Sequence, residues 1–230
     1  MSDETFVIPL PPAVSVPVAG ATARFPVRRV FCVGRNYAAH AREMGHDPDR
    51  EPPFFFQKNA GDVVGPGEVP YPPHTNDLHH EVELVVAIGR GGKDIAIGAA
   101  LGHIYGYAVG LDLTRRDVQA ALKKAGRPWE TAKAFPHSAP VGTIQPAADI
   151  GHPVRGRLTA TVDGALRQDG DLGDMIWNVP EIIAHLSTWF ELEAGDLIFT
   201  GTPAGVGELV RGNVVEGAIE GIGSLRVAIV

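Results

Sequence analysis

Residues 79–86 read HHEVELVV, a run of apolar residues that contains two glutamates. Alternation of side chains along a strand places Glu81 and Glu83 on one face, and Val82 and Leu84 on the other. Two like charges on a buried face are costly unless a positive charge lies between them. The glutamate face is therefore either open to water or binds a cation.

Many short strands are predicted around this stretch, because apolar runs alternate with glycine and proline. The chain of 230 residues contains 28 glycines and 19 prolines, which fall between these runs rather than in one tract. Strands are expected at 29–34, within 52–61, at 81–88 and within 104–114, in a hairpin over 157–170 that turns at Asp163 and Gly164, and in three further segments between 196 and 230.

Local capping signals predict a few helices beside these strands. They indicate a helix over 36–45 with Asn36 as N-cap and Gly45 just past its end, one over 114–126 with Thr114 and Asp117 spaced as a capping box, one over 178–192 with Asn178 and Glu181 spaced likewise, and a short helix within 95–103. Helices and strands do not alternate regularly enough for a doubly wound sheet. We therefore expect a mostly β (α+β) fold with a few flanking helices.

Composition restricts the class of protein. Hydrophobic residues make up 44% of the chain and charged residues 20%, and no apolar run approaches the roughly 20 residues that span a membrane. The net charge of −7, without a basic stripe, argues against nucleic acid as a partner. The single cysteine, Cys32, lies in an apolar strand pattern and is expected to be buried.

The chain is expected to contain one catalytic domain. The proline-rich residues 1–28 are predicted to form an edge segment of short strands or loops, and residues 29–230 to form the domain. The start, MSDETFVIPL, is acidic where a secretory signal would be basic, so a cytoplasmic protein is expected.

Asp112 completes a possible metal site with the two glutamates. It lies near the end of the apolar strand predicted within 104–114, and three carboxylates favour a hard cation, Mg²⁺, Mn²⁺ or Ca²⁺. The alternative is a half-exposed strand face with scattered acids. His79 shares the face of Glu81 and Glu83 and would shift the preference towards a transition metal, although a hydrogen-bonding or packing role is the more ordinary one.

Two further pairs of residues have spacings that suit catalysis or binding. His40 and Glu43 lie three apart on a predicted helix, where a carboxylate can orient an imidazole for general base catalysis, but a chance surface pair has the same spacing. Arg116 and Gln119 also share a helix face, which points either into a pocket with Asp112 or into solvent.

Single polar residues beside apolar ones offer weaker signals. Lys58 and Lys133 could each bind an anion, or extend to the surface along their aliphatic stems. TGTPAGVG at 200–207 lacks the ending of a phosphate-binding loop, and reads as a turn that brings the Thr202 hydroxyl near a ligand or as a plain turn.

Six segments together resemble the fumarylacetoacetate hydrolase family, in particular its short, single-domain acylpyruvate and fumarylpyruvate hydrolase branch. In chain order they are VGRNYAAHAREMG, PPFFFQKNAG, LHHEVELVV, GYAVGLDLTRRDVQ, AKAFPHSAP and TGTPAGVG. The resemblance extends from about residue 28 to the C-terminus. It implies mixed β-sheets rolled around one another, usually in a homodimer, with a central divalent metal that is Mg²⁺ or Mn²⁺, or Ca²⁺ as a substitute.

The same resemblance implies roles for individual residues. The implied metal ligands are Glu81, Glu83 and Asp112, the implied water-activating pair on a lid segment is His40 and Glu43, the lysine beside the metal is Lys133, and the substrate-contacting positions are Lys58, Arg116, Gln119 and Thr202. In one departure, Asn59 follows Lys58 where relatives commonly have proline.

The expected substrate is a small anionic 2,4-dioxo acid. The resemblance implies hydrolysis of the carbon–carbon bond of an acylpyruvate, with 3-fumarylpyruvate giving fumarate and pyruvate in gentisate-type aromatic catabolism. The alternatives are oxaloacetate decarboxylation or cleavage of another acylpyruvate at the same site, since fold alone does not choose the reaction. A catalytically silent binding protein is a further alternative, which the His40–Glu43 pair disfavours.

Overall fold

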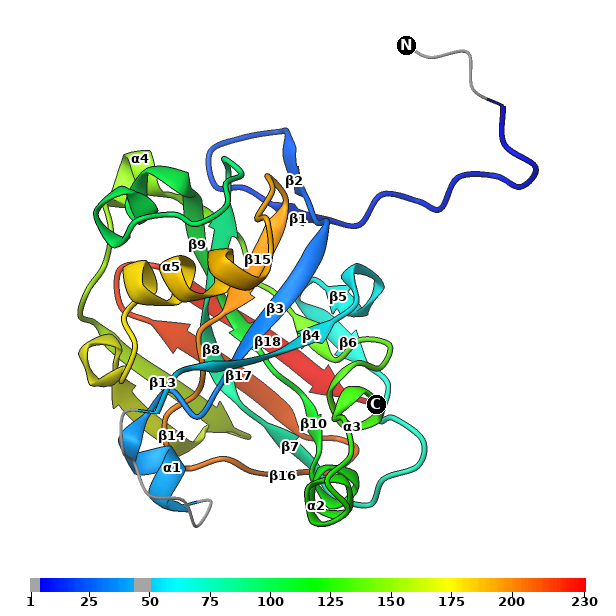
Figure 1. The fold of residues 1–230 in the computed structure, drawn as a ribbon. Helices are drawn as coiled ribbons and strands as arrows, with labels where there is room; N and C mark the ends of the chain where they lie inside the picture. Colours follow the sequence, from blue (N-terminus) through cyan, green and yellow to red (C-terminus); the bar gives the residue numbers. More distant parts are fainter. Residues whose placement is uncertain (1–4, 44–50) are drawn as a thin grey trace.

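Strands dominate the computed structural model, which describes residues 5–43 and 51–230 (Figure 1). The largest sheet has six strands in the order β12-β9-β8-β15-β3-β4. Their bounds are β3 Arg29–Gly34, β4 Phe54–Lys58, β8 Val82–Ile88, β9 Ile104–Leu111, β12 Gln145–Pro146 and β15 Asp196–Phe199. The sheet is mixed, because β15 runs parallel to β3 and antiparallel to β8.

A second sheet has five strands in the order β14-β13-β17-β18-β6. Their bounds are β6 Gly67–Val69, β13 Arg157–Val162, β14 Ala165–Asp171, β17 Val214–Ile219 and β18 Gly223–Ile229. The predicted hairpin is confirmed, with β13 and β14 paired antiparallel and both turn residues, Asp163 and Gly164, at positive φ.

Smaller elements complete the fold. The remaining strands are β1 Ser15–Pro17, β2 Arg24–Pro26, β5 Val63–Val64, β7 Leu78–His80, β10 Thr114–Arg115, β11 Ala139–Pro140 and β16 Gly207–Leu209. The α-helices are α1 Ala38–Glu43, α2 Arg116–Lys124, α3 Glu130–Lys133, α4 Ala147–Ile150 and α5 Val179–Trp189, and the 3₁₀ helices are η1 Ala60–Asp62, η2 Ile97–His103 and η3 Leu172–Asp174. No helix in the described ranges is both long and apolar enough to cross a membrane.

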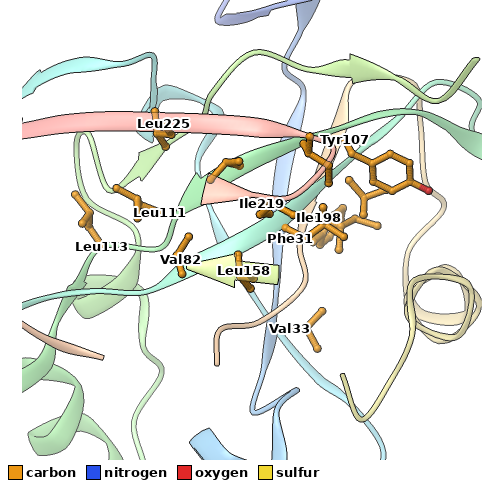
Figure 2. Close-up of a cluster of buried hydrophobic side chains, with 14 of the residues drawn as sticks. Phe31, Val33, Val82, Tyr107, Leu111, Leu113, Leu158, Ile198, Ile219 and Leu225 are labelled. Carbon is orange, nitrogen blue, oxygen red and sulfur yellow. The ribbon is translucent and has the colours of Figure 1, made fainter. Parts of the chain in front are cut away.

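The main core lies between the two large sheets (Figure 2). Val82 from β8 and Leu111 from β9 meet Leu158, Ile219 and Leu225 from the five-stranded sheet. The predicted alternation therefore holds, because the even-numbered residues of β8 fill this core.

A second core covers the other face of the six-stranded sheet. Val85 and Phe199 pack there with Val16 and Phe25, which belong to the short strands β1 and β2. Cys32 lies in the same core, and burial raises the pKa of its thiol, as expected for a cysteine that fills space. Burial on both faces leaves the carboxylate of β8, Glu83, no open surface on the sheet itself.

The helix capping predictions had mixed outcomes. The box before α5 is confirmed, because the Asn178 side chain accepts from Glu181 N at 3.0 Å and Glu181 Oε2 accepts from Asn178 N at 3.0 Å. The box at Thr114 is wrong: Thr114 belongs to β10, and Asp117 instead accepts from the hydroxyl of Thr75 at 2.6 Å. That distant partner satisfies the carboxylate that the local spacing had assigned to a cap.

Asn36 was also wrongly predicted as an N-cap. Helix α1 begins at Ala38, and the buried Asn36 side chain instead donates to the backbone oxygens of Trp177 and Thr200, at 2.9 and 2.8 Å. Gly45, the predicted end, lies outside the described residues.

Two strand boundaries and one helix end differ from prediction. Glu81 separates β7 from β8 instead of opening the strand, β9 ends at Leu111, and α5 ends at Trp189. The segment after 196 forms four strands, because β16 pairs with β7 in a small sheet that the sequence did not indicate.

Candidate active site

Three carboxylates converge at one end of the six-stranded sheet. Glu83 belongs to β8. The backbone N–H of Asp112 donates to the backbone oxygen of Glu81 at 2.8 Å, which places Asp112 opposite Glu81. One carboxylate oxygen from each of the three residues lies within 4.8 Å of the others. Because each residue is at most 4% exposed, the alternative of a half-exposed strand face is wrong.

Two buried lysines neutralise part of this charge. Lys133 Nζ at the end of α3 lies 2.7 Å from Glu81 Oε2, Asp112 Oδ2 and Thr114 Oγ1. Lys58 Nζ at the end of β4 lies 2.9 Å from Asp112 Oδ1 and also donates to backbone oxygens. Lys58 is 3% exposed and Lys133 is 2% exposed, so neither lysine extends to the surface.

Glu81, Glu83 and Asp112, called the triad below, do not share the same electrostatic environment. Burial alone would raise the pKa of Glu81, but Lys133 and Arg116 outweigh it and hold that pKa well below its usual range. For Glu83, burial raises the pKa well above its usual range, and the charges of Asp112 and Glu81 raise it further. Glu83 is therefore the carboxylate whose negative charge most lacks a positive partner.

The donor set fits a hard divalent cation. All three groups offer carboxylate oxygens, and a cation among them would stabilise the charge of Glu83. His79 does not join this group: its Nε2 lies 2.8 Å from Asp77 Oδ1, and its Nδ1 accepts from Arg116 Nε at 3.3 Å. The hydrogen-bonding alternative for His79 is the one observed.

Arg116 and Gln119 face the pocket rather than solvent. They lie on the first turns of α2, where Arg116 Nη2 donates to Glu81 Oε1 and Nη1 donates to Gln119 Oε1 at 2.6 Å. Both line the pocket above the triad. The shared helix face predicted from their spacing is confirmed.

His40 lines the same pocket, and its imidazole is almost fully buried. Its Nδ1 lies 3.2 Å from Glu43 Oε2, and Glu43 in turn accepts from the backbone N–H of Gly205 at 3.1 and 3.2 Å. The pair is therefore tied to the turn at 200–207 and is more than a chance surface contact. With Nδ1 held by Glu43, Nε2 is the ring nitrogen left to act in the pocket.

The turn at 200–207 supplies backbone and a hydroxyl. Gly201, at φ 96, donates its N–H to Glu83 Oε2 at 2.7 Å, in a left-handed conformation that favours glycine. The Thr202 hydroxyl lines the pocket, but it already donates to Val82 O at 2.8 Å and accepts from Gln168 Nε2 at 2.7 Å. Thr202 thus fixes the turn while remaining in reach of a ligand.

Gln168 is a buried residue of the site that sequence reasoning missed. Its Nε2 donates to Thr202 Oγ1 and Pro203 O, and its Oε1 accepts from Val82 N at 3.1 Å and from His80 Nδ1 at 2.9 Å. Its place on β14, in the middle of a hairpin, gave no local signal. The sheet pairing brings it beneath the turn.

The pocket extends outwards from the triad past an aromatic wall. It is partly open to solvent, and its lining combines charged groups with apolar side chains, as sites for small ligands do. Phe54, Phe56 and Trp129 form the wall, and Arg35 and Lys123 add positive charge. No local pattern of residues indicates that these five share a pocket.

Asn59 holds the turn after Lys58 in a different way from proline. Its φ of −79° is close to the value that a proline ring would impose. In addition its backbone N–H, which proline lacks, donates to Asp62 Oδ2 at 2.8 Å. The departure from the family pattern therefore leaves Lys58 firmly placed.

Known proteins resemble the chain over most of its length. Residues 29–230 match the family model described as fumarylacetoacetate (FAA) hydrolase C-terminal. The crystal structure of fumarylpyruvate hydrolase from Pseudomonas aeruginosa in complex with Mn²⁺ and pyruvate is 52% identical, with a TM-score of 0.97, and the match covers 98% of this chain and 99% of that one.

Two curated relatives carry names for oxaloacetate chemistry. Oxaloacetate tautomerase YcgM from Escherichia coli is 42% identical over 205 residues, which are 88% of this chain and 93% of that protein. The mitochondrial oxaloacetate decarboxylase of Dictyostelium discoideum is 38% identical over 196 residues, 85% of this chain and 90% of that protein. With the site geometry and the family match in agreement, the chain belongs to the fumarylacetoacetate hydrolase family.

Proposed function

We propose that the protein is a divalent-metal-dependent hydrolase of acylpyruvates, with 3-fumarylpyruvate as substrate and fumarate and pyruvate as products. One observation carries the proposal: the His40–Glu43 pair, which suits activation of water, opens into the same pocket as the carboxylate triad. The 52% identity with a fumarylpyruvate hydrolase over nearly the whole chain supports the choice of substrate.

Glu81, Glu83 and Asp112 would hold the ion, Mg²⁺ or Mn²⁺, with Ca²⁺ as a substitute. The bound ion would supply positive charge that polarises the 2-oxo acid and stabilises negative charge on the departing pyruvate. Mn²⁺ in the Pseudomonas aeruginosa structure supports a divalent metal for the family site.

Positively charged and polar side chains would orient the 2-oxo acid end of the substrate. Arg116 and Gln119 present a guanidinium and an amide at the pocket wall, and Thr202 adds a hydroxyl. Lys58 and Lys133 lie below them and offset the charge of the carboxylates. The anionic substrate thus meets local positive charge in a chain whose net charge is −7.

His40 would act as general base. With Nδ1 oriented by Glu43, Nε2 takes a proton from water, and the hydroxide oxygen forms a bond to the distal carbonyl carbon. The carbon–carbon bond next to that carbonyl then breaks, its electron pair stays with pyruvate, and the proton that His40 took from water completes the pyruvate methyl group. Lys133 stabilises the negative charge that develops on the pyruvate side.

A coupled assay tests the reaction. Pyruvate release is followed by its reduction with lactate dehydrogenase for fumarylpyruvate, acetylpyruvate and oxaloacetate in parallel, and fumarate formed in water labelled with heavy oxygen is weighed by mass spectrometry. Hydrolysis predicts one labelled oxygen in fumarate. Glu81→Ala should abolish turnover while its circular dichroism spectrum stays that of the wild type. Full activity of Glu81→Ala, or of the wild type in excess chelator, would contradict the proposal.

Oxaloacetate chemistry is the second candidate function. The names of the Escherichia coli and Dictyostelium discoideum relatives favour it, as tautomerisation and decarboxylation respectively. Neither reaction forms a new carboxylate with an oxygen from water, so the labelling experiment separates them from hydrolysis. Preferred turnover of oxaloacetate, with no label in a carboxylate of the product, would select this candidate.

Several broader features belong to the same proposal. We expect residues 29–230 to act as one catalytic domain, in aromatic catabolism of the gentisate type, as a cytoplasmic homodimer. Light scattering after size-exclusion chromatography tests the dimer. Cell fractionation tests the location. A mitochondrial location is the alternative, because the Dictyostelium discoideum relative is named as mitochondrial.

A further inference from the structure

The outer part of the pocket carries two positively charged side chains, Arg35 and Lys123, that the proposed chemistry at the triad does not use. Arg35, Arg116 and Lys123 all line this pocket. Arg116 is paired with Glu81, whereas no carboxylate within residues 5–43 and 51–230 forms an ion pair with Arg35. Partial burial, and then the charges of Arg35 and Arg116, lower the pKa of Lys123, which indicates that the cations lie close together.

The backbone and two aromatic rings, Phe54 and Trp129, hold the Arg35 side chain in place; the two rings are called the aromatic shelf below. Arg35 follows β3 with φ 57, a left-handed conformation that is uncommon for residues with a side chain and that concentrates at functional sites. Its guanidinium lies over the ring of Phe54, 5.4 Å from the centroid. Trp129 packs edge-on against the same ring at 5.4 Å.

Gly34 makes this shelf possible. A Cβ atom at Gly34 would lie 2.0 Å from the Phe54 ring, so only glycine allows the ring to lie against the backbone beside Arg35. The neighbouring residues thus place a guanidinium at the wall of the pocket on a rigid support. A guanidinium in such a setting binds a carboxylate through two parallel hydrogen bonds.

We propose that Arg35, supported by Lys123, binds a second carboxylate at the far end of the substrate and so selects acylpyruvates whose acyl group is itself an acid. The inference rests on the proposed function in one respect, that the 2-oxo acid end lies at the triad. The acyl end then points outwards, and in 3-fumarylpyruvate that end is a carboxylate. Acetylpyruvate ends in a methyl group, which gains nothing from Arg35.

The substitution Arg35→Asn removes the guanidinium and suits the backbone, because asparagine adopts the left-handed conformation readily. Loss of a charged hydrogen-bonded pair predicts that the ratio of kcat/KM for fumarylpyruvate to that for acetylpyruvate falls roughly 10- to 100-fold. Arg35→Lys, which keeps the charge without the planar fork, should retain part of the ratio. The matched control is Arg127→Asn, an exposed arginine outside the pocket lining, which should keep the wild-type ratio.

The outcomes separate this inference from the proposed function. An equal fall for both substrates in Arg35→Asn would overturn the inference, because it would give Arg35 a structural role only. If the wild type cleaves neither substrate, the proposed function fails, and calorimetric titration with fumarate and with crotonate, its analogue with a methyl group in place of one carboxylate, decides the inference. Tighter binding of fumarate that is lost in Arg35→Asn and kept in Arg127→Asn would support it. A wild type that binds both acids equally would overturn it.

Discussion

Glu83→Gln is expected to have opposite effects on stability with and without a divalent metal. The substitution keeps the size of the side chain and an oxygen that can accept from Gly201 N–H, but it removes the negative charge. Without metal, burial and the carboxylates of Asp112 and Glu81 disfavour that charge and raise the pKa of Glu83 well above its usual range. The neutral amide should therefore stabilise the metal-free protein.

The size of the effect follows from the linkage between protonation and folding. Each unit by which folding raises the pKa corresponds to about 1.36 kcal/mol, or roughly 3–5 °C in Tm for a chain of this length. The folded state binds the extra proton, so the wild type loses this stability as pH rises from about 4.5 through the folded pKa of Glu83. The advantage of Glu83→Gln in chelator should therefore widen as pH rises.

A bound divalent metal should reverse this order of stability, so that the wild type becomes more stable than Glu83→Gln. A ligand that binds only the folded state at 100 times its dissociation constant stabilises by about 2.7 kcal/mol, or roughly 5–11 °C for a chain of this length. The wild type should gain this in Mn²⁺, and Glu83→Gln, with one charged ligand removed, should gain much less. Thermal unfolding in excess chelator and in a Mn²⁺ series measures both effects.

The matched control is Glu68→Gln, which removes one negative charge at an exposed position of β6. It should follow the wild type in chelator and in metal alike. Two results would refute the reasoning. One is a Glu83→Gln protein that is less stable than the wild type in chelator. The other is a metal-induced rise in Tm equal to that of the wild type, which would remove Glu83 from the metal site.

Three further substitutions each remove one polar interaction of the fold. Lys133→Met leaves the buried Glu81 without its lysine and should lower the metal-free free energy of unfolding in urea by about 3–5 kcal/mol; a loss below about 1 kcal/mol would contradict burial of the pair. Asn59→Pro should gain about 0.4–1 kcal/mol from a stiffer unfolded chain but lose the charged hydrogen bond to Asp62, worth about 1.5–3 kcal/mol, so a higher Tm would disagree. Asn178→Ala should lower the free energy of unfolding, measured in urea, by about 1 kcal/mol because the N-cap of α5 is lost. An unchanged midpoint of denaturation would argue against the cap.

The centre of the site was predictable because its signal is local. The positions of Glu81 and Glu83 followed from alternation along one strand, and that of Asp112 from its place at the end of an apolar run. Backbone pairing between β8 and β9, extended by the hydrogen bond from Asp112 N to the backbone oxygen of Glu81, then brings the three together. The strand pattern left a metal site and a half-exposed acidic face both open, and the family resemblance favoured the metal site and added roles.

The outer pocket was not predictable because distant segments assemble it. Arg35, Phe54 and Trp129 come from three separate elements, and each taken alone is an ordinary surface or core residue. A distant partner also explains why the capping box predicted at Asp117 does not form. The Asp117 carboxylate instead accepts a hydrogen bond from the hydroxyl of Thr75, which lies 42 residues away in the chain. Short-range spacing predicts a contact only where no tertiary partner offers a better one.

The charges of the site connect the metal with the class of substrate. The buried carboxylates of the triad lie beside two lysines and Arg116, so the fully ionised cluster is nearly neutral before any cation binds. A divalent ion would then leave an excess of positive charge among buried groups, and an anionic 2-oxo acid would remove that excess. Metal and substrate should therefore strengthen each other's binding by the same factor. Under the proposed function, a second carboxylate on the substrate would fall outside this balance, and the inference assigns it to Arg35 at the outer wall.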